Sequence, residues 1–417
     1  MEKVCFITLG CKVNKYESDC MARILKDHGY AISHDLEPAD IYIVNSCAVT
    51  NEGEKKSRQV ISKIRAINPT AKIVYTGCAS EHSLKQFEDK GIWGAIGTVN
   101  KENILEIVQN GGFIKYNHDG IYEKLSNPLT SQTRAYIKVQ DGCNRFCSYC
   151  LIPYLRGRSR SRELSDIVEE ASKIAQIAKE IVLVGIDISD YKIGEKQALG
   201  ELIWALKDIK SRIRLGSFEA NIISRDLLEL LKVTKNFVPH FHLSLQSGDD
   251  SVLKAMNRKY TASEFFEKCS LIREYFPDAN ITTDIIVGFP TETEEMFENT
   301  CRFVKMVRFG KIHVFPYSKR AGTMASKLED LPKSIKTERV NKLVEIGNQL
   351  QLEFNKENLG KICSVILEEE VGDYIEGFTD NYIKVYIKKT GKFKSGDVVK
   401  VKLVSLREMG IEGEIVC

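Results

Sequence analysis

The sequence predicts an α/β protein built from three parts: an N-terminal parallel α/β domain over residues 1–130, a partial (β/α)6 barrel with a linker helix over residues 131–355, and a small β-barrel over residues 356–417. Three observations predict this organisation. Strand-like and helix-like stretches alternate up to about residue 317, as in parallel sheets. One long helical period then covers residues 336–358. From Lys361 onward, short runs of alternating apolar and polar residues are separated by glycines, which is typical of a small barrel.

The composition is that of an ordinary globular chain, 43% hydrophobic and 28% charged. Apolar runs such as residues 181–184 are far shorter than the roughly 20 residues that cross a bilayer. The first residues read as a strand and not as a secretory signal. Twelve cysteines in such a chain favour metal binding in a reducing cytosol over a disulfide framework. We therefore expect a cytoplasmic protein without membrane contact.

In the N-terminal domain, three strand-like runs each end at a cysteine. The runs at residues 4–9, 41–44 and 73–76 lead to Cys11, Cys47 and Cys78, and helical stretches at 16–26 and 55–67 separate them. The carboxyl ends of parallel strands face one crevice, so these thiols could converge on one inorganic ligand. Gly10 and Gly77, each just before its cysteine, suit tight turns close to such a ligand. The alternative is three buried core cysteines, which are common.

A second group of cysteines follows the strand at 134–141. Cys143, Cys147 and Cys150 stand at spacing C-x3-C-x2-C, and three such thiolates can hold three irons of a 4Fe–4S cluster. The next cysteine along the chain is Cys269, which leaves one iron open for a small molecule. A structural zinc site is the alternative, but it needs a fourth ligand, and His118 is the one candidate within thirty residues.

The middle part contains six predicted β/α units, with strands at 134–141, 181–184, 213–218, 241–245, 281–287 and 312–315. Six units do not close an eight-stranded barrel, so we expect a lateral mouth for a macromolecular substrate. Polar or glycine residues where strands become loops are the candidate cofactor-binding residues: Asp187, Gln246, Asp284 and Gly288. Glycines at such positions are also common in plain turns.

Two stretches are candidates for binding nucleic acid. Arg156, Arg158, Arg160 and Arg162 follow the cysteine loop at every second position and could hold phosphates; a solvated charged turn is the alternative. The C-terminal segment has no net basic charge, so RNA binding there needs a local face. Tyr382 and Lys384 are candidates, because aromatic rings can stack on bases. A purely structural barrel is the alternative.

These motifs resemble known families. The spacing of Cys143, Cys147 and Cys150 resembles that of the radical S-adenosylmethionine (SAM) superfamily, whose open iron chelates the amino and carboxylate groups of SAM. GCKVN-x-YES at residues 10–18 and N-x-CAVT at residues 45–50 resemble the methylthiotransferases, in the branch that acts on N6-threonylcarbamoyladenosine in tRNA. Lys15 and Ser46 depart slightly from the commonest form. The C-terminal part resembles the TRAM module, an RNA-binding barrel.

The resemblance implies two 4Fe–4S clusters, the auxiliary one on Cys11, Cys47 and Cys78, with SAM as cosubstrate. The implied reaction methylthiolates carbon 2 of N6-threonylcarbamoyladenosine beside the anticodon, at position 37. The implied partners are tRNA and an electron donor such as a flavodoxin or ferredoxin; the oligomeric state is left open. Three alternatives also stay open: isopentenyladenosine as target, a ribosomal-protein aspartate as target, or a non-catalytic iron–sulfur regulator that binds RNA.

Overall fold

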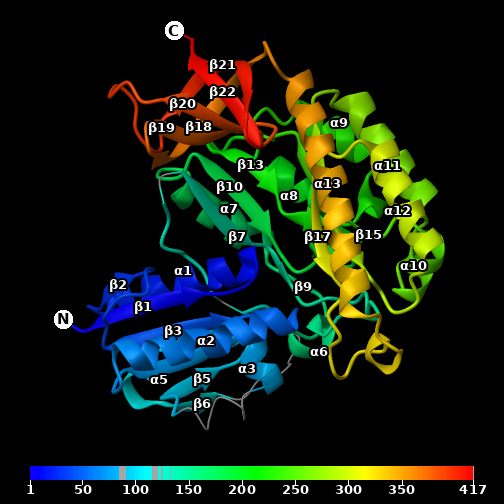
Figure 1. The fold of residues 1–417 in the computed structure, drawn as a ribbon. Coiled ribbons are helices and arrows are strands. Elements are labelled where there is room, and N and C mark those ends of the chain that lie inside the picture. The colour runs from blue at the N-terminus through cyan, green and yellow to red at the C-terminus, as the bar shows by residue number, and fades with distance from the viewer. Residues whose placement is uncertain (84–90, 115–120, 124, 132, 417) are drawn as a thin grey trace.

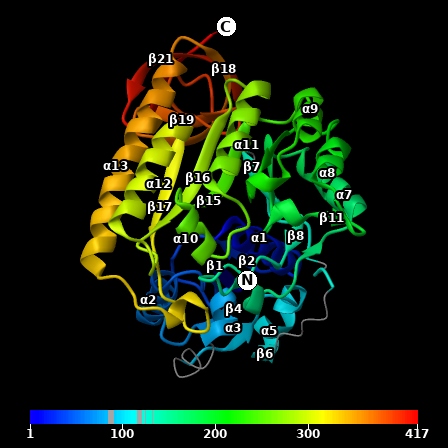
Figure 2. The same ribbon diagram turned by 90° about the vertical axis from the view of Figure 1, so that its right-hand side faces the viewer.

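The computed structural model describes residues 1–83, 91–114, 121–123, 125–131 and 133–416. His118 and Cys417 lie outside these ranges. Figures 1 and 2 show three sheet systems in chain order: an N-terminal open sheet, a central incomplete barrel and a closed C-terminal barrel beside one end of the central strands. The predicted fold class is confirmed.

The N-terminal sheet has six parallel strands in the order β2-β1-β3-β4-β5-β6. The strands are β1 (Lys3–Thr8), β2 (Ala31–Ser33), β3 (Ile41–Ser46), β4 (Lys72–Gly77), β5 (Gly94–Ile96) and β6 (Gly112–Ile114). The helices are α1 (Lys12–Asp27), α2 (Asn51–Ile67), α3 (Cys78–Ser83) and α5 (Ile104–Asn110). Alternate residues of β3 enter two cores, since Tyr42 packs on the α2 side and Ile43 on the side of α1 and α5.

The central domain has two parallel sheets, β13-β10-β7 and β14-β15-β16-β17. Its main strands are β7 (Arg134–Lys138), β10 (Glu180–Val184), β13 (Arg212–Leu215), β14 (Ser217–Phe218), β15 (His240–Gln246), β16 (Asn280–Val287) and β17 (Lys311–Pro316). Gly216 separates β13 from β14, so both belong to the third of six β/α units, as predicted. Two short strands, β8 (Gln140–Asp141) and β9 (Arg160–Ser161), pair beside the cysteine loop.

Helices cover the outer face of these strands (Figure 2). They are α7 (Leu164–Ile174), α8 (Leu199–Ala205), α9 (Arg225–Val233), α10 (Asp250–Ala255), α11 (Ala262–Tyr275) and α12 (Glu294–Val307), and the short α6 (Ile152–Leu155) follows the cysteine loop. Strands β7 and β17 are the two edges of the incomplete barrel. On β17, Ile312 and Val314 pack toward the core, whereas His313 and Phe315 on the other face are exposed. The inner face at β17 is therefore open to solvent.

Helix α13 (Lys333–Glu357) runs along β17 and leads to the closed barrel β18-β19-β20-β22-β21. Its strands are β18 (Ile362–Val371), β19 (Tyr374–Thr379), β20 (Lys384–Lys388), β21 (Val398–Arg407) and β22 (Gly410–Ile415). The barrel contacts the amino ends of the central strands: Arg134 Nη2 lies 2.6 Å from Glu368 Oε1, and Arg212 donates to the Ser364 carbonyl at 2.6 Å. Within the ranges that the structure describes, no helix is both long and apolar enough for a bilayer span.

Candidate functional site

The first cysteine group lies at the carboxyl edge of the N-terminal sheet. Cys11 caps the start of α1, Cys47 follows β3, and Cys78 begins α3 directly after β4. Because β1, β3 and β4 are neighbours in the sheet, the three residues share one edge, as the sequence indicates. Gly10 has φ +122°, and a Cβ there would stand 3.0 Å from the Cys47 Cβ. A glycine therefore lets these two segments approach.

Asn14 holds the same edge together from the first turn of α1. Its Nδ2 donates to the Ser46 carbonyl at 2.8 Å and to the Leu9 carbonyl at 3.2 Å, and the Asn45 Nδ2 donates to the Asn14 carbonyl at 2.9 Å. Asn14 thus ties α1 to the ends of β1 and β3. Cys11 and Cys78 both stand at helix starts.

The second cysteine group lies in the loop between β8 and α6. N–H groups point at all three sulfurs: Arg145 N donates to Cys143 Sγ at 3.4 Å, Ile152 N to Cys150 Sγ at 3.4 Å, and Arg258 Nη1 to Cys147 Sγ at 3.3 Å. Such donors stabilise thiolates and the sulfurs of a bound cluster. Arg258 also pairs with Glu219 at 2.9 Å, which fixes its guanidinium.

Burial makes some of these thiols resist ionisation in the absence of a metal. Burial raises the pKa of Cys47, Cys143 and Cys150 to about 12, and neighbouring thiols raise it further. Cys78 is among the neighbours of both Cys47 and Cys150, so the two groups are close to each other. Iron binding would have to release these protons. No three His, Cys, Asp or Glu side chains of the described ranges surround a single-ion site; a 4Fe–4S cluster instead spreads its ligands over separate irons.

A buried ion cluster joins the two cysteine groups. Glu17 on α1 is fully buried and pairs with Arg156 at 2.9 Å, Lys138 at 3.0 Å and Lys101 at 3.4 Å. Asp141, two residues before Cys143, pairs with Lys138 and Arg156, each at 3.1 Å. Burial alone would raise the pKa of Glu17, but Arg156 and the two lysines lower it to about 2. Charged side chains therefore join the N-terminal and central domains, beside apolar contacts such as Val13 with Val182.

Arg156 is the residue of this cluster that touches a predicted ligand. Its Nε donates to Cys78 Sγ at 3.3 Å, and its Nη2 donates to Asn14 Oδ1 at 3.2 Å. In the ion pairs among described residues, four cations (Lys101, Lys138, Arg156 and Arg160) face three carboxylates (Glu17, Glu123 and Asp141). A thiolate at Cys78 would balance that charge, so the donor set fits an anionic sulfur-ligated group.

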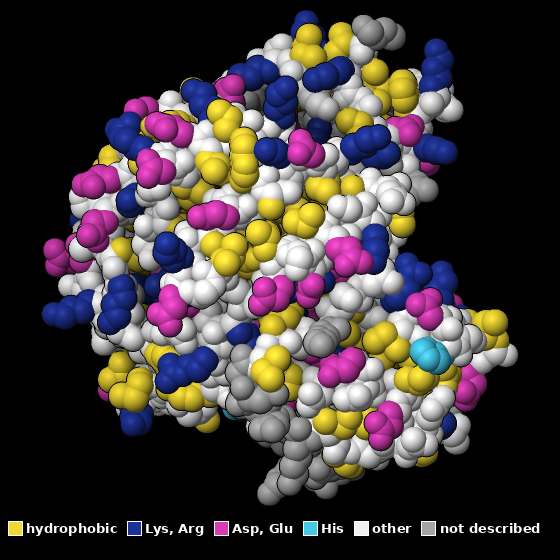
Figure 3. All heavy atoms as spheres, turned by 180° about the vertical axis from the view of Figure 1, so that it is seen from behind, with side chains coloured by type: hydrophobic (Ala, Val, Ile, Leu, Met, Phe, Trp, Pro, Cys, Tyr) yellow, Lys and Arg dark blue, Asp and Glu magenta, His cyan; other side chains and the backbone are white. Residues whose placement is uncertain are grey.

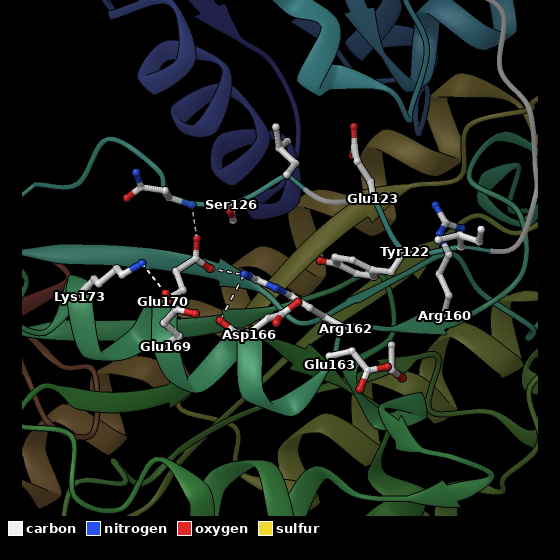
Figure 4. Close-up of a pocket in the computed structure, with 14 residues that line it drawn as sticks. Tyr122, Glu123, Ser126, Arg160, Arg162, Glu163, Asp166, Glu169, Glu170 and Lys173 are labelled. Atoms are coloured by element: carbon white, nitrogen blue, oxygen red, sulfur yellow. Dashed lines mark hydrogen bonds and ion pairs between the residues drawn. The ribbon is translucent and has the colours of Figure 1, made fainter. Parts of the chain in front are cut away.

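The prediction that the whole arginine run faces RNA is wrong for two of its members. Arg156 is fully buried, and Arg162 is buried against Glu170 and Tyr16. Figure 4 shows Arg162 directed at Glu170. Both residues line a cavity of about 650 Å³ beside α7. Neither arginine can reach a phosphate, because a buried, paired arginine is already satisfied. Arg160 lines the same cavity and lies 3.5 Å from Asp141, whereas Arg158 is exposed.

Tyr382 also differs from its prediction. It precedes β20 instead of sharing a strand face with Lys384. Its ring stacks on Phe378 at 4.6 Å between ring centroids, and the His240 ring lies tilted against it at 4.9 Å. The Arg214 guanidinium lies 4.3 Å from the same ring. These contacts make the half-buried ring part of a contact between domains, and its stacking on RNA bases stays a prediction. Lys384 pairs with Glu376 at 2.7 Å and stays a prediction.

The four candidate cofactor residues lie at strand ends of the central domain. Asp187 is buried and pairs with Arg145 at 2.8 Å, beside the cysteine loop. Gln246 sits at a register shift with φ +73°, an uncommon conformation that clusters at functional sites. Asp284 accepts from His242 at 3.0 Å. Gly288 is buried against Lys336. Their contact with SAM stays a prediction.

Sequence patterns missed the charged residues that surround the ligands. Nothing in the local sequence marks Glu17, Lys138 or Asp141 as buried. Arg258 lies more than a hundred residues from Cys147. The one local signal is the placement of Asp141 directly before the cysteine loop. Charged side chains reach buried sites only when paired, and the pairing depends on contacts between domains.

Comparisons with known proteins agree with this geometry. Residues 137–304 match the model of the radical SAM superfamily, and residues 3–96 match that of "Uncharacterized protein family UPF0004". The "Threonylcarbamoyladenosine tRNA methylthiotransferase MtaB" of Bacillus subtilis is 38% identical over 100% of this chain and 97% of the relative. The "tRNA-2-methylthio-N(6)-dimethylallyladenosine synthase" of Thermodesulfovibrio yellowstonii is 34% identical over 98% and 97%.

Among solved structures, the radical SAM methyltransferase TsrM of Kitasatospora setae has a TM-score of 0.55 at 14% identity, covering 95% of this chain and 84% of its own. That likeness concerns the fold alone. The central domain and its cysteine loop define a radical SAM enzyme, a class whose cofactors are a 4Fe–4S cluster and SAM. With the N-terminal match and the full-length relatives, the chain belongs to the radical SAM methylthiotransferase family.

Proposed function

We propose that this enzyme methylthiolates carbon 2 of N6-threonylcarbamoyladenosine at position 37 of tRNA, next to the anticodon. The observation that carries the proposal is the pair of cysteine groups at facing strand ends, joined through Arg156. The choice of this nucleoside as substrate rests on relatives. The threonylcarbamoyladenosine tRNA methylthiotransferases of Bacillus subtilis and Thermotoga maritima are 38% and 37% identical across the whole chain.

The chain's own residues would hold two 4Fe–4S clusters, one on Cys143, Cys147 and Cys150 and an auxiliary one on Cys11, Cys47 and Cys78. When bound, these groups and SAM supply the one-electron chemistry and the methylthio group. The protein supplies position and exclusion of water. Arg258 and the backbone N–H groups of the loop orient the first set of sulfurs, and Arg156 orients Cys78. Asp187, Gln246, Asp284 and Gly288 are the proposed SAM neighbours.

The surface offers a place for the tRNA. Seen from behind, the molecule is hollowed between the C-terminal barrel and the N-terminal domain, and Lys and Arg side chains gather at the lower edge of this hollow (Figure 3). Positive side chains at this edge can bind the phosphates of the tRNA backbone. Arg158 and Lys384 keep this role in the proposal, whereas Arg160 belongs to the buried ion cluster through Asp141. The electron donor is proposed to be a flavodoxin or ferredoxin.

Mass spectrometry of tRNA nucleosides tests the proposed reaction. A strain that lacks this gene should lose the 2-methylthio form of N6-threonylcarbamoyladenosine and keep the unmodified nucleoside. The 2-methylthio form of isopentenyladenosine should be unchanged, and a plasmid copy of the gene should restore the lost signal. Loss of the isopentenyl form instead would assign the enzyme to the other tRNA branch.

A further inference from the structure

The inner face of the incomplete barrel is charged, unlike its outer face. Successive strand residues point to opposite sides, and residues such as Ile137, Leu183 and Leu243 face the helices in the main core. The alternate residues therefore face the interior. They include at least one charged or titratable side chain from each unit, among them Arg134, Glu180, Arg214, His240, Asp284 and His313.

Lys12 enters this interior from the N-terminal domain. It is the first residue of α1, and its neighbour Val13 is buried against Val182 and Val184 of β10. Helix α1 packs against β7 (Figure 1). The ammonium group of Lys12 lies within electrostatic reach of a side chain on every one of the six units, namely Arg134, Glu180, Arg214, His240, Asp284 and His313. Lys12 therefore faces the interior of the barrel, as the packing of the neighbouring Val13 on β10 also requires.

The anions around Lys12 already have partners. Glu180 lies 2.6 Å from both Arg134 and Arg214, and Asp284 accepts from His242 at 3.0 Å. No hydrogen bond or ion pair of Lys12 side-chain atoms is found among the residues that the structure describes. Lys12 remains reachable by solvent, as do His313 and Phe315 on β17. The two arginines and two carboxylates around Lys12 balance each other, so among the described residues Lys12 is a cation without a matching anion at the mouth of the barrel.

We infer that Lys12 binds the carboxylate of the threonylcarbamoyl group and so selects this substrate over one with an uncharged N6 substituent. The inference rests on the proposed function. A carboxylate beside Lys12 would relieve its repulsion from Arg134 and Arg214. An apolar dimethylallyl group would remove water from the ammonium without offering it an anion. Attraction of the carboxylate and this penalty on the apolar group both contribute to the choice of substrate. A hydrogen bond between charged groups favours the matching ligand by about 10- to 100-fold.

The test measures binding of anticodon stem-loop RNAs under anaerobic conditions. One RNA carries N6-threonylcarbamoyladenosine, and the other carries the same nucleoside with its carboxylate converted to a neutral primary amide. We expect the wild type to prefer the carboxylate RNA by about 10- to 100-fold. Lys12→Met should bind both RNAs alike. The matched control is Lys15→Met on the same helix, since Lys15 pairs with Asp19 at 2.7 Å, and it should keep the wild-type preference.

Lys12→Arg shows whether the effect of Lys12→Met comes from the lost charge or from a changed structure. It keeps a cation at this position and should retain most of the preference for the carboxylate RNA. Iron content of each variant shows that the neighbouring Cys11 site is intact. A Lys12→Met protein that still prefers the carboxylate RNA overturns the inference. A wild type that methylthiolates the threonylcarbamoyl RNA but binds it no more tightly than the amide RNA also overturns it. A wild type that fails to modify the threonylcarbamoyl RNA at all overturns the proposed function, and the inference with it.

Discussion

At the scale of single residues, Arg156 connects the two halves of the site. Its guanidinium contacts Cys78 and Asn14 of the N-terminal domain, and it pairs with Asp141 two residues before Cys143. Such a fully buried side chain fixes the distance between two loops more firmly than a surface pair would. Arg156 therefore joins two domains, whereas its place in the run of arginines predicts a contact with RNA phosphates.

Arg156→Met should destabilise the protein by about 3–5 kcal/mol, because it leaves buried carboxylates with fewer partners. The metal-free protein should therefore unfold several degrees lower in scanning calorimetry, and the reconstituted protein should bind less iron. Arg158→Met is the control, since Arg158 is exposed, and it should stay within about 0.5 kcal/mol of the wild type. Equal melting temperatures for both variants would show that Arg156 is not a structural link.

Residue-level prediction has the most to work with where the candidate ligands lie close together in the sequence. Cys143, Cys147 and Cys150 lie within eight residues, so their spacing alone indicates one site. The environment of Arg156, Arg162 and Tyr382 depends on partners far along the chain, such as Glu17 for Arg156 and His240 for Tyr382. No local pattern states whether a charged or aromatic side chain points inward.

At the scale of elements, the strands with strong apolar runs were predictable and the short ones were not. Strands β3, β4 and β16 follow β-branched, apolar stretches and lie where the pattern puts them. Strands β2, β5 and β6 have three residues each, and two of them begin with glycine. Three residues are too few to show a period, so tertiary pairing alone creates these strands.

The contact between α1 and the central strands predicts an acid response. The pKa of Glu17 is lowered to about 2 by its cationic partners, and that of Glu180 is lowered to about 2 by Arg214 and Arg134, in both cases against the effect of burial. A carboxylate with a lowered folded-state pKa stabilises fully above its unfolded value of about 4.5, and this stability is lost as the pH falls toward 2.

The melting temperature of the metal-free protein should therefore fall between pH 5 and pH 3, with each of the two carboxylates contributing up to about 1.4 kcal/mol per pH unit. Glu17→Gln should lower stability at pH 7 and flatten the fall. Glu338→Gln, on the exposed side of α13, should leave the profile unchanged. A wild-type melting temperature that does not change over this range would contradict the charged-interface account.

At the scale of the whole molecule, three sheet systems meet around one incomplete barrel. The N-terminal sheet contributes a cysteine group and the first turn of α1, the central strands contribute the second cysteine group, and the C-terminal barrel covers the amino ends of the central strands through Arg134 and Glu368. The sequence predicts the three parts but not their docking, since buried pairs such as Glu17 with Lys138 join residues more than a hundred positions apart.

The central claim is that each cysteine group holds its own 4Fe–4S cluster. Iron and sulfide analysis after anaerobic reconstitution tests it most directly. The wild type should hold about eight irons per chain, and alanine replacement of either Cys11, Cys47 and Cys78 or Cys143, Cys147 and Cys150 should leave about four. A wild-type iron content that persists after replacement of Cys11, Cys47 and Cys78 would contradict the account.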